Sequence, residues 1–434
     1  MKKIISILMI LCICFAICAC KGGETSSGTD NTSTPNSSLG QSSDENKKPS
    51  SSSKVEESSS KVEESSKTSE PDRETITAFA PARKFSTKAV SQKRTLNNTA
   101  YKLNNNKKLN VLYYGGSVTA GVGGTAGNSW ASRTEKWLKS TYPRAQINCT
   151  NKAVSGSCVY FGNFRADLDV IPYAPDLMFI EFAVNDSYED LYYAQSAYYL
   201  EMLIKRVNTK FPQTDIIILL ITDKGKVGEK FENNAAHKAV AEHYGIPCID
   251  LGAELAKLVN SGAGKWEDYL SDYVHPNDKG YEMYANFITE KLKTMLAIDA
   301  KALKNHVMPE ESYIVGGINM DCKTVTADKV KLNDGWKLEN SNCKSYTTCI
   351  SPKKQGSKIT IEFEGTSFGM YLTTAKGNTV VATVDGKERK IFIKPDDEGE
   401  HERLVFDNLI KGKHKVEIES VSSGDVNIYA FFIG

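Results

Sequence analysis

Five residues whose types suit ester cleavage lie far apart in the sequence, at Ser117, Gly156, Asn185, Asp272 and His275. A serine hydroxyl is a weak nucleophile until a neighbouring base takes its proton, and the imidazole of His275 can be that base. Asp272, three residues earlier, can bind the second ring nitrogen. A developing oxyanion needs fixed donors, which the Ser117 N–H, the Gly156 N–H and the Asn185 amide would supply. These residue types therefore indicate acyl transfer through a serine nucleophile.

The middle of the chain must position these residues, and its pattern alternates between short apolar runs and longer helical stretches. This alternation predicts an α/β fold with a doubly wound, flavodoxin-like parallel sheet of about five strands. We expect residues 78–108, which precede it, to be an extended lead-in. The predicted strands lie at 109–114, 145–149, 177–182, 216–221 and 247–251, and the longer helices at 129–141, 193–211, 229–244 and 277–297.

The position of each polar segment relative to these strands suggests a common site. Ser117, Gly156 and Asn185 each follow a predicted strand. Asp272 and His275 lie just before the last predicted helix. Because ligands of a doubly wound sheet bind beyond the carboxyl ends of its strands, we expect these segments to meet at that edge.

The four segments resemble, in family order, the nucleophile, glycine, asparagine and D-x-x-H blocks of the SGNH (GDSL-type) hydrolases. Gly116 stands where that family usually has an aspartate, a variant that resembles its polysaccharide-esterase branches, and Ala183 replaces a frequent glycine. Neither change removes a catalytic group. The resemblance implies a hydrolase domain over residues 78–300. It implies a catalytic triad of Ser117, Asp272 and His275, and an oxyanion hole formed by Ser117, Gly156 and Asn185.

Each segment taken alone also has a plain structural explanation, such as a turn at Gly-Gly-Ser, a helix cap at Asn185 or a surface pair at Asp272 and His275. There is no Lys-Ser/Thr pair and no G-x-G-x-x-G at the proper place, which argues against a phosphate-binding loop or a dinucleotide site. His237 and His243 are six residues apart on a predicted helix, so they face different sides and are poor joint metal ligands. We therefore expect no metal and no cofactor.

Other polar and aromatic residues have a structural interpretation. Glu181 lies inside the third predicted strand and is interpreted as a buried carboxylate near the site rather than a catalytic group. Trp130 and Trp137 are expected to pack in the core. Cys149 and Cys158 flank the glycine block and could form a disulfide, but the pairing of the six cysteines beyond the first twenty residues is left open.

The N-terminus indicates export. Two lysines precede an uncharged run at 4–19, which is short for a membrane span and typical of a signal peptide. The run ends at Cys20 in a segment that resembles a bacterial lipobox, so residues 1–20 are expected to be a lipoprotein signal with Cys20 lipidated, or else an ordinary secretory signal. Residues 21–77 are rich in Ser and polar residues and are expected to be a disordered tether. The predicted location is the extracellular face of the cell membrane, by lipid anchor or after secretion.

The C-terminal part, residues 301–434, changes to short strand-like runs with turn signals, which predicts an all-β sandwich or jelly roll. Predicted strands include 358–363, 379–384, 390–393, 413–420 and 427–433, with a hairpin turn at Asp385-Gly386. It resembles the β-sandwich of family 2 carbohydrate esterases, although there that domain precedes the catalytic one. It is interpreted either as a spacer or as a carbohydrate-binding module that uses aromatics such as Trp336, Tyr346 or Tyr371.

These features favour an extracellular serine esterase that removes small acyl groups, acetyl above all, from a polysaccharide or a small ester. The same residues would also suit a lipase, a lysophospholipase or a thioesterase, and a surface-binding protein that lacks activity is a third possibility. With 54 Lys and Arg against 53 Asp and Glu, the chain lacks the excess positive charge of a nucleic-acid binder. Contact with a membrane is expected through the lipid anchor only.

Overall fold

The computed structural model describes residues 80–90, 92–224, 231–343, 346–374, 379–392, 400–421 and 426–434. The predicted signal peptide, Cys20 and the predicted tether lie outside these residues. Residues 73–434 group into one compact unit by their contacts. Within the described part, no helix combines the length and the apolar composition needed to cross a membrane.

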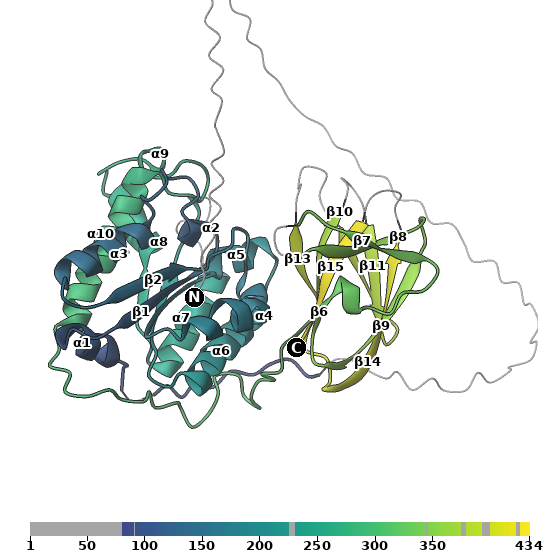
Figure 1. Cartoon of the computed structure of the whole chain (residues 1–434), viewed down its shortest axis with the longest axis horizontal. Coiled ribbons are helices and arrows are strands. Elements are labelled where there is room, and N and C mark those ends of the chain that lie inside the picture. Colours follow the sequence, from purple (N-terminus) through teal and green to yellow (C-terminus); the bar gives the residue numbers. More distant parts are fainter. Residues whose placement is uncertain are drawn as a thin grey trace, which may run out of the picture. The chain divides into compact units, whose positions relative to one another are not determined.

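A five-stranded parallel sheet forms the centre of the α/β part, with the strand order β2-β1-β3-β4-β5 (Figure 1). This order, in which the chain first moves outward to one edge and then to the other, is that of a doubly wound fold and confirms the predicted class. Each end of the five strands lies within two residues of its predicted position: β1 Leu109–Gly115, β2 Ile147–Asn151, β3 Leu177–Glu181, β4 Asp215–Leu220 and β5 Cys248–Asp250.

Helices cover both faces of this sheet because the side chains of its central strands are apolar on both sides (Figure 1). Met178 and Ile180 of β3 pack in one core, whereas Leu177 and Phe179 pack in the other. The first core is covered by α4 Val159–Asp169, α6 Tyr193–Lys210 and α7 Glu232–Tyr244. The second is covered by α1 Asn97–Asn104, α3 Trp130–Thr141, α8 Leu251–Asn260 and α10 Asp278–Leu296.

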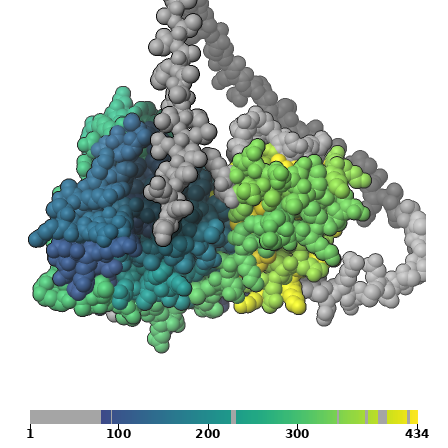
Figure 2. Space-filling view, in the orientation of Figure 1, coloured from purple at the N-terminus to yellow at the C-terminus, as the bar shows by residue number. Residues whose placement is uncertain are grey.

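The predicted lead-in at 78–108 was wrong in part, because it contains helix α1. Leu96, Ala100 and Leu103 bury their side chains in the second core, and α1 contacts α10. In the space-filling view the purple surface of this N-terminal segment lies beside the green surface of later residues (Figure 2). A helix of eight residues carries too short a pattern to stand out in the sequence, and its packing stabilises it.

The three longest predicted helices begin and end close to the expected residues, and polar caps mark several ends. The side chain of Asn277 accepts a hydrogen bond from the Gly280 N–H at the start of α10, and Ser129 does the same for Ser132 at the start of α3. Gly245, with φ +65°, ends α7 in the left-handed conformation. These caps fix where the helices around the site begin.

The C-terminal part, here called the β module (residues 323–434), consists of antiparallel sheets packed around a separate core. Asp385 and Gly386 both have positive φ, as the predicted hairpin turn between β11 and β12 requires. One sheet contains β6 Lys323–Thr326, β7 Trp336–Asn340, β8 Thr348–Pro352, β10 Phe368–Thr374, β13 His401–Phe406 and β15 Val426–Ile433. The other contains β9 Lys358–Gly365, β11 Thr379–Val384, β12 Lys387–Phe392 and β14 Gly412–Ser420.

Two of the three aromatic residues suggested for carbohydrate binding pack inside the protein. Trp336 is only 2% exposed and lies in the core of the β module. Tyr371 is 4% exposed and stacks on Phe161 of α4. Tyr346, which is half-buried, packs against Tyr371. The expectation that Trp336 and Tyr371 bind carbohydrate is therefore wrong, because neither presents a free ring face.

Candidate active site

The predicted nucleophile lies in a sharp turn from strand β1 into the short helix α2, Ser117–Ala120. Ser117 is the first residue of α2 and is 9% exposed. Gly121 ends this helix with φ +96°, a conformation that side chains rarely adopt. From α10, the Tyr281 hydroxyl donates to the carbonyl oxygens of Val118 and Val122 at 3.1 and 2.7 Å. The Tyr281 hydroxyl thus holds the backbone just after Ser117 in place.

The predicted triad residues meet in one hydrogen-bonded chain. His275 Nε2 lies 2.8 Å from Ser117 Oγ, and His275 Nδ1 lies 2.6 Å from Asp272 Oδ2. Both distances suit proton transfer from the hydroxyl to the ring and orientation of the ring by the carboxylate. His275, which is 158 residues away from Ser117 in the sequence, therefore contacts the nucleophile. This agrees with the prediction that the two segments meet at one edge of the sheet.

The loop that carries Asp272 is itself ordered by hydrogen bonds. Asp272 Oδ1 accepts the backbone N–H groups of Val274 and His275 at 2.9 and 2.8 Å. Partial burial alone would raise the pKa of Asp272, but these two N–H groups and the imidazole outweigh it and lower the pKa below the ordinary value. The Asp272 carboxylate is consequently charged at neutral pH.

The predicted oxyanion donors come from three adjoining segments. The Asn185 side chain, from α5 Ala183–Tyr188, donates one amide hydrogen to the Ser157 carbonyl oxygen at 3.0 Å, which leaves the second hydrogen for a ligand. Gly156 has φ +81° and open space around its α-carbon. Among the hydrogen bonds of the described residues, the Gly156 and Ser117 N–H groups have no acceptor. The Ser117 and Gly156 N–H groups and one amide hydrogen of Asn185 are therefore without an acceptor among the described residues.

The structure explains why glycine replaces the usual aspartate before the nucleophile. A Cβ atom at Gly116 would lie 2.1 Å from Asn185 Nδ2, far inside contact distance. The Asn185 amide packs directly on the Gly116 backbone and so approaches Ser117 closely. Gly116 is therefore part of the way the amide is placed, and a side chain there would displace it.

Glu181 lies beneath the nucleophile turn as a buried carboxyl group, as predicted. Its Oε2 accepts the Thr119 hydroxyl at 2.8 Å and the Gly116 N–H at 3.4 Å, while Oε1 has no partner among the described residues. Burial raises the pKa of Glu181 to about 7, and the Thr119 and Gly116 donors only partly oppose this. Glu181 supports the turn without reaching the reacting atoms in these contacts.

Of the remaining predicted residues, the two histidines follow their structural interpretation and the two cysteines do not pair as suggested. His237 is fully buried and its Nε2 lies 2.9 Å from Asp186 Oδ2, whereas His243 contacts the Glu311 carbonyl oxygen elsewhere. Cys149 and Cys158 form no disulfide, so the suggested bridge is wrong. Burial raises the pKa of the Cys149 thiol to about 11, which makes it a poor nucleophile. No group of three metal-ligating side chains occurs in the described ranges.

Several residues that shape the site were not singled out from the sequence. Asp186 follows Asn185 and accepts the Val159 N–H at 2.7 Å, which ties the asparagine segment to the start of α4. Asp278 accepts the Thr125 N–H at 2.7 Å and thereby holds the loop after Ser117. The proximity of Asp186 and Asp278 to the predicted site residues was the available signal, but their partners lie far away in the sequence.

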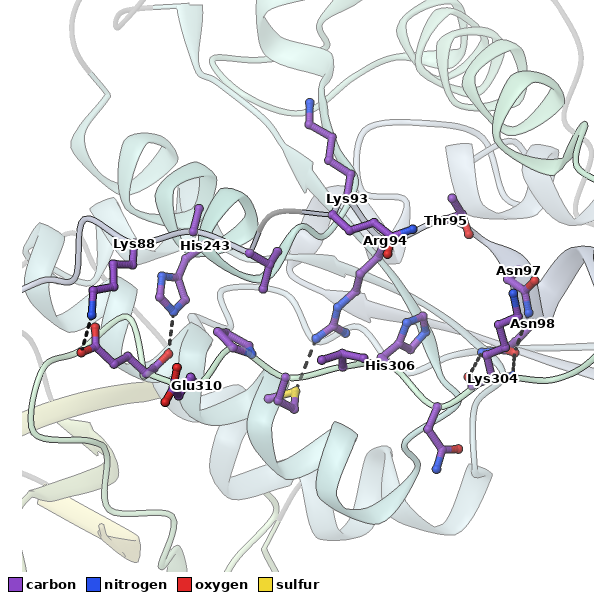
Figure 3. Close-up of a pocket in the computed structure, with 18 residues that line it drawn as sticks. Lys88, Lys93, Arg94, Thr95, Asn97, Asn98, His243, Lys304, His306 and Glu310 are labelled. Carbon is purple, nitrogen blue, oxygen red and sulfur yellow. Dashed lines mark hydrogen bonds and ion pairs between the residues drawn. The ribbon is translucent and has the colours of Figure 1, made fainter.

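A cavity of about 1050 Å³ lies away from this site (Figure 3). It is lined by residues 88–90, 92–95, 97–98 and 304–311, together with His243. His306, on its wall, contacts Asp215 at the amino end of β4, so the cavity lies at the edge opposite the triad. Much of its polar lining is internally paired, as between Lys88 and Glu311. The cavity lies between the two chain segments that line it, and none of the predicted catalytic residues is among its lining residues.

The family match supports a carboxylic ester hydrolase. Residues 113–283 match the model of the GDSL-like lipase/acylhydrolase family, and residues 350–434 match the carbohydrate esterase 2 N-terminal domain. Both resemblances predicted from the sequence are thereby confirmed, including the reversed order of the two domains. No curated protein matches the sequence significantly.

Solved structures show the same two-part architecture. A two-domain esterase active on acetylated mannans superposes with a TM-score of 0.67 at 19% identity, over 78% of this chain and 96% of that one. The same esterase co-crystallised with mannopentaose gives a TM-score of 0.65 at 18% identity, over 78% and 95%. An acetylxylan esterase from Geobacillus stearothermophilus matches 44% of this chain and 95% of its own, with 18% identity and a TM-score of 0.38. At these identities the first two likenesses establish the fold.

Proposed function

We propose that the chain is an extracellular serine esterase that removes acetyl groups from a polysaccharide through an acyl-enzyme intermediate. The observation that carries this proposal is the hydrogen-bonded chain from Ser117 Oγ through His275 to Asp272, at 2.8 and 2.6 Å. A serine hydroxyl bonded to an imidazole that is bonded in turn to a carboxylate is the arrangement that activates a nucleophile.

We propose the following role for each group in the first half of the reaction. Ser117 Oγ attacks the ester carbonyl carbon while His275 Nε2 takes the hydroxyl proton. The carbonyl oxygen becomes an oxyanion, which the N–H groups of Ser117 and Gly156 and the Asn185 amide stabilise. Collapse breaks the bond to the sugar oxygen, and the imidazolium returns its proton to that oxygen. The product is acetylated Ser117 and a free sugar hydroxyl.

The second half of the reaction uses the same groups in the reverse direction. His275 takes a proton from water as the water attacks the acetyl carbon of Ser117. The oxyanion forms again beside the same donors and collapses with cleavage of the bond to Ser117 Oγ, which releases acetic acid. Ser117 recovers its proton from His275, so the enzyme is unchanged after one turnover. This chain of steps requires neither a reductant nor an oxidant.

The substrate part of the proposal rests on the two matched regions. One model describes acylhydrolases and the other a carbohydrate esterase domain. The two-domain esterase that shares the fold acts on acetylated mannans. An acetylated mannan is therefore our first choice of substrate and acetylated xylan the second.

We expect acetate release from acetylated mannan and xylan, and rapid cleavage of nitrophenyl acetate relative to nitrophenyl octanoate. Acetate is measured enzymatically on both polymers and on a peracetylated monosaccharide, and the chain-length series is followed by absorbance. A lipase or lysophospholipase on the same machinery would give the opposite preference in the chain-length series, which would refute the acetylesterase proposal.

The extracellular location is a separate part of the proposal and rests on the N-terminal sequence. We infer that residues 1–20 direct export and that Cys20 carries a lipid. We expect metabolic labelling with a fatty-acid analogue to mark the wild-type protein but not a Cys20→Ser variant, which should leave the membrane fraction. Equal labelling of both proteins would contradict this assignment.

A further inference from the structure

Strand β13 of the β module contacts the segment that carries one of the proposed oxyanion donors. Glu402 Oε1 accepts the backbone N–H of Cys158 at 3.2 Å. Cys158 is the residue before α4 and lies two residues after Gly156. Glu402 is 7% exposed and Cys158 is 1% exposed, so this contact is sealed from water. The segment from Gly156 to Cys158, here called the glycine segment, is therefore hydrogen-bonded at its end to a side chain of the β module.

The next residue of the same strand contacts the segment that carries the second donor. Arg403 forms an ion pair with Glu189, the residue that caps the C-terminal end of α5. Asn185 lies within α5, four residues before Glu189. Two consecutive residues of β13 thus bind the two separate chain segments that present Gly156 and Asn185.

The two segments are also joined to each other at the start of α4. Asp186 Oδ1 accepts the Val159 N–H at 2.7 Å, next to the Cys158 N–H that Glu402 accepts. The first N–H groups of a helix have no partner within the helix, so carboxyl groups satisfy them well. One of these two comes from the asparagine segment and the other from the β module.

Aromatic packing gives β13 a firm position against α4. Phe161 of α4 stacks on Tyr371 with ring centroids 5.2 Å apart, and Phe164 stacks on Phe432 at 4.9 Å. Tyr371 belongs to β10, which pairs with β13 on one side and with β15, the strand of Phe432, on the other. The face of α4 is therefore packed on the same sheet whose edge strand carries Glu402 and Arg403.

We propose that Glu402 and Arg403 are positioning residues, through which the β module holds the glycine and asparagine segments in the geometry that stabilises the oxyanion. This inference rests on the proposed function. It also assigns the module a role in acyl transfer itself, beyond that of a spacer. Removal of the Glu402 contact should move the donors relative to Ser117, and small displacements of such groups are costly in rate.

The charges around Glu402 support a neutral carboxyl group at this position. Burial, and after it the nearby Glu189 carboxylate, raises the pKa of Glu402 to about 8, while the Cys158 N–H, Arg165 of α4 and Arg403 oppose the shift. Below that pKa the group is protonated and still accepts the Cys158 N–H. Above that pKa, Glu402 would carry a negative charge close to the segment of Gly156, and this charge would disfavour the negatively charged transition state.

We expect Glu402→Leu to lower kcat for nitrophenyl acetate by about tenfold or more, with KM changed less than about twofold. Glu402→Gln keeps the size and the acceptor oxygen and should restore most of the lost kcat. Because its amide cannot ionise, this variant should also keep its activity as the pH rises through about 8, where wild-type activity falls. The matched control is Glu417→Leu, which removes a paired carboxylate on β14 of the other sheet.

Thermal unfolding of each variant separates a loss of positioning from a loss of folding. A Glu402→Leu protein with wild-type kcat overturns the proposal, and so does a Glu402→Gln protein that is as impaired as Glu402→Leu while unfolding at the wild-type temperature. If the wild-type protein itself cleaves no ester, the proposed function fails instead. If wild type is active and Glu402→Leu equals it, only the positioning role fails.

Discussion

Replacement of Ser117 by alanine should lower kcat/KM for nitrophenyl acetate by about 10⁴-fold or more, to the residual rate that the oxyanion donors and substrate binding supply. The change removes the one oxygen that lies 2.8 Å from His275 Nε2. Without it, neither the acyl-enzyme nor its hydrolysis can occur. The measurement is the steady-state rate of nitrophenol release, compared with the uncatalysed rate in the same buffer.

We expect Ser117→Ala to fold like wild type, because the substitution is small and local. Ser117 begins a four-residue helix, and alanine is compatible with that conformation. Ser140→Ala is the matched control, because its hydroxyl is exposed and donates only to the Trp137 carbonyl oxygen. Equal hydrolysis by wild type and Ser117→Ala would leave the non-catalytic surface-binding protein as the better interpretation.

The second large effect should come from Asp272→Asn, for which we expect a fall in kcat of about 10³- to 10⁴-fold. The carboxylate accepts from the ring at Nδ1 and from two backbone N–H groups. An asparagine amide can present its nitrogen to the ring and favour the tautomer whose Nε2 carries a hydrogen. That ring cannot take the Ser117 proton, and the imidazolium loses its stabilising charge.

The pH dependence distinguishes this explanation from a simple loss of structure. The pKa of Asp272 is lowered from its ordinary value, so in wild type its protonation reduces activity only at acid pH. Wild-type kcat/KM should therefore lose the contribution of this carboxylate only at acid pH, whereas Asp272→Asn has no carboxylate to protonate there. Asp268→Asn, on an exposed carboxylate of the neighbouring short helix, is the control and should keep full activity. An Asp272→Asn enzyme within about tenfold of wild type would contradict the assigned role.

The contacts of the β module bear on how the two matched regions work together. Tyr371, one of the rings that the sequence suggested for binding sugar, packs on α4 instead. Glu402 and Arg403 drew no attention in the sequence, because an acidic residue beside a basic one is a common surface pattern. Their partners, Cys158 and Glu189, lie more than 200 residues away.

The amino-acid sequence by itself determined the class of the fold and the membership of the candidate site. The central strands β3 and β4 are largely apolar runs, and the long helices repeat apolar residues at helical spacing, so both patterns are local and readable. Ser117, Asn185, Asp272 and His275 stand at strand ends or before the last helix, and their chemical types are complementary. This local information sufficed to place them at one edge before any coordinates were considered.

Only the tertiary structure decided the contacts between segments that are distant in the chain. It revealed that Gly116 makes room for the Asn185 amide, that Cys149 and Cys158 form no disulfide and that Glu402 ends the glycine segment. It also revealed α1 and α4, whose packing against other elements outweighs their weak local patterns. Propensity and periodicity act within a few residues, whereas these features depend on which surfaces meet after the chain has folded.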